Sequence, residues 1–269
     1  MIRARMIGSL LARCLTGDGL SGTVIASVRG AVYIQVRGLP VVSLSSDSNG
    51  NSALSATLDM DPEALDWRQG TPLFLSRAGV FHEDLRVVSF DGASVWDAGG
   101  LVGPPAASRQ RIVAAGKAAL DLVWPGCAVP GAGEVLEMLS RYRPGASEWA
   151  LNLLGLGPGL TPAGDDALAG ITAVLAVSSR SMRALRFRYH VVASSYRHTN
   201  LISISLLAQC ASGMPPEVLA RFIRALLLAE DVTQAAERLS CVGHTSGSFM
   251  ALGAILGAGT SQQWTEAYP

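Results

Sequence analysis

The sequence predicts an α+β protein in which a β-rich domain precedes a helical domain. Between residues 20 and 97, short runs of β-branched and alternating apolar residues are separated by glycine and polar turns, which is typical of a small β-barrel or sandwich. From Ala106 onward, apolar residues recur at helical spacing. The segment LVGPP at 101–105 divides the two patterns, so we expect one domain at 1–103 and a second at 104–269.

Short strands are expected to build the first domain, after a short N-terminal helix. Arg29-Gly30 is expected to form a hairpin turn, because glycine adopts the backbone conformations that tight turns need. The polar segment SSDSNGN at 45–51 is expected to be another turn. The expected strands lie at 23–28, 31–36, 39–44, 53–58, 72–76, 80–81, 85–90 and 94–96.

Helices are expected to build the second domain. The first of them should end before Pro125, since proline lacks a backbone N–H and its ring crowds the preceding turn. The run from Ala167 to Val177 is almost wholly apolar and predicts a buried helix. The arginine-rich segment from Arg180 to Tyr196 receives no helix assignment. The expected helices lie at 112–123, 135–142, 148–154, 167–177, 203–210, 218–228, 232–239 and 249–256.

Composition and charge exclude several classes of function. Lys+Arg and Asp+Glu number 21 each. A neutral chain is poorly suited to binding the phosphate backbone of a nucleic acid, so no nucleic acid is expected as a partner. No stretch has the continuous apolarity of a membrane span and no secretory leader is evident, so a cytoplasmic protein without a membrane partner is expected. With 49% hydrophobic residues, the chain is expected to bury surface against other subunits or in a homo-oligomer.

The four cysteines argue against a cysteine-built zinc site and against a small disulfide scaffold. Cys14, Cys127, Cys210 and Cys241 are widely separated and form no CxxC pair, so we expect free thiols. No HExxH motif is present either. No metal ligands are therefore assigned from the sequence.

The most informative segment is LGPGLTPAGDD at residues 156–166. Thr161 is expected to be the N-cap of the buried helix, with Pro162 at its first position. Asp165 and Asp166 then fall in the first turn, where the helix dipole favours negative charge. The glycines exceed what a helix cap needs, and they allow the backbone to approach a ligand closely. They are Gly157, Gly159 and Gly164.

Two later loops place small hydroxylated residues directly before an apolar helix: RHTN at 197–200 and GHTSGS at 243–248. Helix N-termini present unpaired N–H groups and partial positive charge. We therefore expect the three loops to converge on one pocket that binds a small anionic ligand, either a carboxylate or a phosphate. The expected ligand-binding residues are Gly157, Gly159, Thr161, Gly164, His198, Thr199, Asn200, Gly243, Thr245, Ser246 and Gly247.

Three side chains are candidates for catalysis. Asp165 and Asp166 diverge by about 100° on a helix, so one can face the pocket while the other reaches a neighbouring loop. Either could be a general base or hold magnesium through water, or both could serve only to stabilise the helix N-terminus. His244 opens the last loop and can supply acid–base function. No cofactor is assigned from the sequence, and magnesium is kept as an alternative.

Three motifs carry a family resemblance: GLGPGLTPAGDDALAG at 155–170, HTNLISISLLAQCASG at 198–213 and VGHTSGSFMALGAILG at 242–257. Together they resemble the AllH-type family, a domain of unknown function whose namesake is a subunit of the oxamate carbamoyltransferase of allantoin degradation. The resemblance covers about residues 150–258 and implies a role in carbamoyl or small-carboxylate chemistry, within purine catabolism. Two alternatives stay open: a non-catalytic docking subunit of a larger complex, and a free-standing magnesium-dependent enzyme that uses Asp165 and Asp166.

Overall fold

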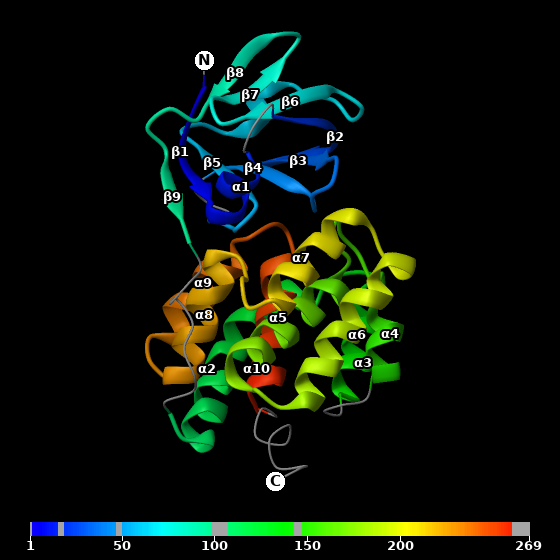
Figure 1. Ribbon diagram of the computed structural model, residues 1–269. Helices are drawn as coiled ribbons and strands as arrows, with labels where there is room; N and C mark the ends of the chain where they lie inside the picture. The colour runs from blue at the N-terminus through cyan, green and yellow to red at the C-terminus, as the bar shows by residue number, and fades with distance from the viewer. Residues whose placement is uncertain (1, 16–18, 47–49, 98–106, 143–146, 260–269) are drawn as a thin grey trace. The chain divides into compact units, whose positions relative to one another are not determined.

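The computed structural model describes residues 2–15, 19–46, 50–97, 107–142 and 147–259. The chain divides into two compact units, Met1–Ala98 and Gly99–Pro269 (Figure 1). The expected domain boundary after Gly103 lies outside the described residues. The sequence-predicted class is confirmed: a β-barrel between residues 2 and 96 is followed by a helical region.

The first unit is an eight-stranded barrel and not a sandwich. Its strands follow the order β5-β4-β3-β2-β6-β7-β8-β1, and antiparallel pairing of β1 with β5 closes the ring. The eight barrel strands are β1 (Ile2–Gly8), β2 (Leu20–Val28), β3 (Ala31–Val36), β4 (Val42–Ser45), β5 (Ser55–Leu58), β6 (Pro72–Ser76), β7 (Gly79–His82) and β8 (Leu85–Ser89). A ninth strand, β9 (Ser94–Trp96), pairs in parallel with β1.

Strand β1 is the element of the barrel that the sequence analysis missed. It pairs in parallel with β8 at Ile2 and Arg3, and then with β9 from Met6 to Gly8. The short helix α1 (Ser9–Cys14) follows it. Apolar and arginine residues alternate over Ile2 to Met6, as in a strand with one solvent-exposed face, but the run is too short to distinguish a strand from the helix expected at the N-terminus.

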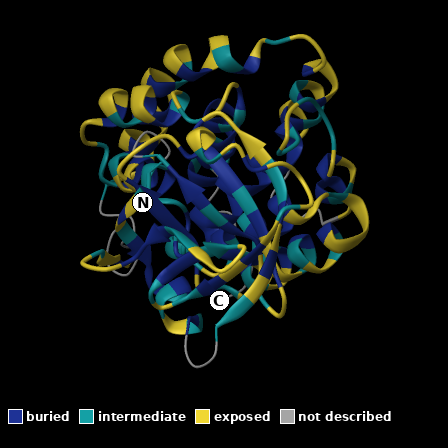
Figure 2. Cartoon of the chain, turned by 90° about the horizontal axis from the view of Figure 1, so that it is seen from above, coloured by how far each residue is buried: buried dark blue, intermediate teal, exposed yellow. Residues whose placement is uncertain are grey.

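The second unit contains helices α2 to α10. Their bounds are α2 (Arg109–Cys127), α3 (Gly133–Ser140), α4 (Ser147–Leu153), α5 (Ala163–Ser178), α6 (Met182–His198), α7 (Leu201–Ala211), α8 (Glu217–Leu228), α9 (Val232–Ser240) and α10 (Ser246–Gly259). Outer helices are buried on one side, and yellow exposed residues follow the other side in Figure 2.

One predicted helix end was wrong, and one helix was not predicted. Helix α2 does not end before Pro125 but continues to Cys127. Proline is tolerated because it lies in the last turn, where little helix remains for its missing N–H to weaken. The arginine-rich segment, which received no helix assignment, forms α6 from Met182 to His198. Its buried residues, Ala184, Phe187, Val191 and Ser195, recur at helical spacing, but the many arginines between them obscure the pattern.

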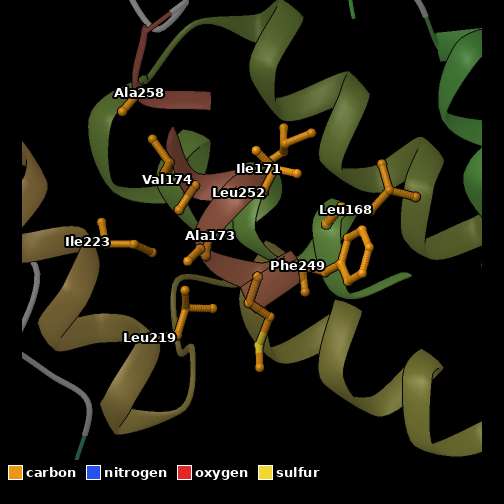
Figure 3. Close-up of a cluster of buried hydrophobic side chains, with 14 of the residues drawn as sticks. Leu168, Ile171, Ala173, Val174, Leu219, Ile223, Phe249, Leu252 and Ala258 are labelled. Carbon is orange, nitrogen blue, oxygen red and sulfur yellow. The ribbon is translucent and has the colours of Figure 1, made fainter. Parts of the chain in front are cut away.

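The core of the second unit is built around α5, in which every residue from Ala163 to Leu175 is buried. Helix α10 packs closely against it because both helices carry glycine at the contact. A Cβ on Gly170 would lie 2.1 Å from the Met250 carbonyl oxygen, and a Cβ on Gly253 would lie 2.0 Å from that of Ala167. Apolar side chains from α5, α8 and α10 fill the surrounding space, as Figure 3 shows.

No helix among the described residues is long and apolar enough to cross a membrane. All four cysteines are free, as expected. Burial raises the pKa of the Cys127 thiol to about 12 and raises the pKa of the Cys210 thiol as well. Both buried thiols are therefore held in the protonated, unreactive form.

Candidate functional site

The three loops singled out in the sequence meet in the structure, at the N-terminal ends of α5, α7 and α10. The hydroxyl oxygens of Thr161 and Ser246 are 2.9 Å apart, which joins the loop before α5 to the start of α10. The Asn200 side-chain amide donates to the Leu160 carbonyl at 2.9 Å, which joins the same loop to the start of α7. Segments up to 85 residues apart in sequence are thus joined directly.

The start of α5 differs from the sequence prediction by one residue. The N-cap is Pro162, in an extended conformation, and Thr161 does not cap the helix. The Thr161 hydroxyl instead donates to Asp166 Oδ2 at 3.0 Å. Asp165 and Asp166 do fall in the first turn, as expected. Proline supplies no side-chain acceptor, so the first amides of α5 must find their partners elsewhere.

Those amides are paired within the chain. The N–H of Ala163 donates to the Pro158 carbonyl at 3.2 Å, and that of Gly164 donates to the Leu156 carbonyl at 2.9 Å. The N–H groups of Asp165 and Asp166 both donate to the Pro162 carbonyl, at 2.9 and 3.1 Å. The start of α5 therefore does not aim free N–H groups at a ligand, which corrects the expectation from helix-start chemistry.

Asp165 ties α5 to the loop after α4 and to the start of α7. Its side chain is fully buried. Oδ1 accepts from the Gly155 amide at 2.8 Å, and Oδ2 accepts from the Thr199 hydroxyl. Burial raises the pKa of Asp165, while the hydrogen bonds from Thr199 and Gly155 and the neighbouring Ser203 hydroxyl act in the opposite direction.

Asp166 ties α5 to the start of α10. It is also fully buried, and Oδ1 has no hydrogen-bond partner among the described residues. Burial raises its pKa well above the ordinary value. Hydrogen bonds from Ser246 and Thr161 oppose this shift, and the charge of Asp165 adds to it. The environment therefore favours the neutral carboxylic acid at this position.

The divergence predicted for the two acids is present, but neither carboxylate faces solvent. Each instead bonds to a neighbouring loop. Among the described residues, no group of three or more His, Cys, Asp or Glu could hold a metal ion. The two aspartates therefore hold the starts of α7 and α10 against the start of α5.

The predicted glycines serve the backbone of the same chain. Gly157, Gly159 and Gly243 have φ of 94°, 115° and 61°, in the left-handed region that favours glycine. Gly164 and Gly247 are buried, and a Cβ on them would lie 2.0 Å from the Leu153 carbonyl oxygen and 1.7 Å from that of Leu239. These glycines allow the loops to fold tightly against the ends of neighbouring helices.

The remaining predicted residues divide between the buried junction and its exposed rim. Asn200 caps α7, since its Oδ1 accepts from the amides of Ile202 at 3.0 Å and Ser203 at 3.1 Å. Thr245 is buried. His198 and His244 are exposed, so of the candidate catalytic side chains only His244 reaches solvent.

Gly155 is a junction residue that the sequence analysis did not single out. Its φ is +76°, and a Cβ there would lie 2.2 Å from the His198 carbonyl oxygen. The sequence did carry a signal, because this glycine opens the first motif. Ser203, buried in the first turn of α7, was missed as well, since a serine inside an apolar helix gives no distinctive pattern.

Comparison with known proteins supports the family resemblance. Residues 153–258 match the family described as oxamate carbamoyltransferase subunit AllH. No solved structure shows significant similarity to this chain. The matched segment begins just before Gly155 and ends within α10, so it contains all three loops and both buried aspartates. The resemblance to the AllH-type family is therefore confirmed over the segment that carries the junction.

Proposed function

We propose that this chain is a subunit of a carbamoyltransferase of the AllH kind, and that the rim of the three-loop junction binds a small anionic ligand. The ligand class is a carboxylate, a phosphate or carbamoyl phosphate. The observation that carries the proposal is that three helix N-termini are held together within the segment that matches the family. Their dipoles add positive potential at one place.

The two acids do not oppose this assignment. A buried, unshielded carboxylate beside an anion would repel it, but the environment of Asp166 favours its neutral form. Asp165 keeps its two oxygens engaged by Gly155 and Thr199 within the chain. In the proposal both acids hold the loops in place and neither touches the ligand.

The amides at the start of α5 are occupied, so the ligand must be met by the exposed rim. Arg197 is exposed in the last turn of α6, directly before the loop that contacts Gly155. Its guanidinium can pair with a carboxylate or phosphate in a bidentate manner. His244 is exposed two residues before Ser246 and is the side chain proposed to exchange a proton with the ligand.

Calorimetric titration of the full chain with phosphate, oxamate and carbamoyl phosphate tests the proposal. We expect binding of at least one of them, weakened about tenfold by Arg197→Gln and by His244→Gln, on the order of one lost charge-assisted contact. Arg238→Gln, on the exposed face of α9, and His190→Gln, on α6, are the matched controls and should leave affinity unchanged. No heat with any of the three ligands would refute ligand binding at this rim.

One observation favours a second candidate, a docking subunit without a ligand of its own. Paired amides, buried acids and close glycine contacts are what a rigid helix junction needs, with or without a ligand. On this view the subunit contributes surfaces rather than chemistry. Loss of ligand binding in every titration, with an intact fold, is the result that selects it.

A further inference from the structure

The outer face of α6 carries a row of large exposed side chains. Met182, Tyr189 and Tyr196 are 60%, 69% and 67% exposed. They are spaced seven residues apart, close to two helical turns, so they line up along one side of the helix. The opposite side packs against α4, α5 and α7. Scattered exposed apolar residues are ordinary on a protein surface, but an aligned row of three indicates an interaction surface.

Positive charge lies beside this row. Residues 167–216 contain no Asp or Glu, although the chain as a whole is neutral. Arg186 and Arg197 are exposed on α6, next to the apolar row in the helical repeat. Arg188, by contrast, turns inward and donates to the Ala211 carbonyl at 2.5 Å. The exposed face is thus both aromatic and basic, and it contains no acid of its own.

We propose that this face of α6 docks an acidic amphipathic helix of a different protein. The inference rests on the proposed function, because it names the partner surface of a subunit. Tyrosine, methionine and arginine are enriched at protein interfaces, and tyrosine and arginine dominate their binding energy. An apolar stripe on the partner would cover Met182, Tyr189 and Tyr196, and carboxylates flanking that stripe would pair with Arg186 and its basic neighbours.

Other occupants fit the face less well. A second copy related by two-fold symmetry would set α6 against α6, which brings arginines together with no acid on either helix. A nucleic acid would use the arginines but gain little from Met182, and the neutral chain provides no long-range attraction for it. Charge complementarity therefore selects an acidic protein segment.

Fluorescence anisotropy with two labelled peptides tests the inference on the full chain. One peptide is a 21-residue helix with leucine at heptad positions and glutamate beside them, and the other has lysine in place of every glutamate. We expect the acidic peptide to bind and the basic one not to bind. Tyr189→Ala and Tyr196→Ala should each weaken binding about tenfold, as interface aromatic anchors do.

Charge reversal provides the second arm. Arg186→Glu should weaken the acidic peptide about threefold and improve binding of the basic one. The controls are Arg238→Glu on α9 and Trp124→Ala, an exposed aromatic residue on α2, and neither should change affinity. Folding of each variant is checked by circular dichroism.

Several outcomes would overturn the docking surface. They are failure of both peptides to bind, equal binding of the two, unchanged affinity in the tyrosine variants, stronger binding of a labelled 20-base-pair DNA duplex, and a dimer on size exclusion that Tyr189→Ala dissociates. The anion titration is repeated on Tyr189→Ala and should be unaffected. Peptide binding without any anion binding would refute only the proposed ligand function. Anion binding without any peptide binding would refute only the docking surface.

Discussion

Replacing Gly253 by alanine tests whether the α5–α10 contact holds the junction together. A Cβ at this position would lie 2.0 Å from the Ala167 carbonyl oxygen and 2.7 Å from its carbonyl carbon. Real Cβ contacts essentially never fall under 3.0 Å, so the helices would have to separate by about 1 Å. The obstructing atoms belong to the backbone and cannot rotate aside. Because Ala167 directly follows Asp166, the separation would strain the bonds between Thr161, Asp166 and Ser246.

The magnitude follows from two opposing effects. Overpacking a close contact costs roughly 1–3 kcal/mol and occasionally more, and backbone obstruction places Gly253→Ala at the upper end. Alanine in place of glycine inside a helix returns about 1 kcal/mol through its better propensity. The net expectation is a loss of about 2 kcal/mol in the free energy of unfolding. Overpacking therefore outweighs helix propensity, and the variant is expected to be less stable than the parent.

Gly116→Ala on α2 is the matched control. Its Cβ would meet the Ile255 Cγ2 methyl at 3.1 Å, so a side chain has to shift by a few tenths of an ångström and no backbone atom stands in the way. This small strain opposes the propensity gain of about 1 kcal/mol, and the variant should stay within about 1 kcal/mol of the parent. Urea unfolding followed by circular dichroism at the helix band measures both variants. If Gly253→Ala proves as stable as Gly116→Ala, the close glycine contact does not hold the helices as described.

Three further predictions concern the junction itself. The pKa of Asp166 is raised in the folded state above its ordinary value of 3.8, so the contribution of Asp166 to stability is fully present below pH 3.8 and is lost as pH rises through the folded pKa. Urea unfolding across this pH range should therefore show a flatter profile for Asp166→Asn, and an unchanged profile would contradict the assignment. Thr161→Val removes a hydrogen-bond donor from the buried Asp166 and should lower the free energy of unfolding by about 1–3 kcal/mol. Thr172→Val should cost less, because the Thr172 hydroxyl bonds only to its own helix. Equal losses in chemical denaturation would show that Thr161 has no special role. Asn200→Ala removes a helix cap, so it should lower the free energy of unfolding by about 1 kcal/mol and speed hydrogen exchange in the loop at 156–162. Ser181 caps α6 alone, so Ser181→Ala should cost a similar amount without faster exchange in that loop.

The barrel was predictable from the sequence as far as its strands and turns, because alternation and glycine turns are local signals. Its closure was not, since the pairing of β1 with β5 joins residues more than 45 positions apart and depends on a strand that was not predicted. Arg29-Gly30 was predicted as the first hairpin turn, and β2 and β3 do flank it. The strands could thus be predicted from local sequence patterns, whereas the closure of the barrel depends on pairing between distant residues.

The helical unit shows the same division between local and non-local information. The three loops could be recognised from glycines and hydroxyl residues, and their convergence could be argued from helix-start chemistry. The pairing of the α5 amides could not, because Pro158 and Leu156 carbonyls reach them only through the fold of the glycine loop. The burial of Asp165 and Asp166 could not be read either, since acids in a first turn are more often exposed.

Two adjacent aspartates do what one could not at this place. Side chains about 100° apart on a helix point toward different neighbours, so Asp165 reaches Thr199 before α7 while Asp166 reaches Thr161 and lies by Ser246 at α10. Each acid joins α5 to a different helix start, and each is desolvated in doing so. The helix dipole and the hydroxyl donors offset that cost only if the loops stay in place. The acidic pair and the glycines around it therefore depend on one another, because the close backbone contacts that glycine permits are what keep the donors within reach of the buried acids.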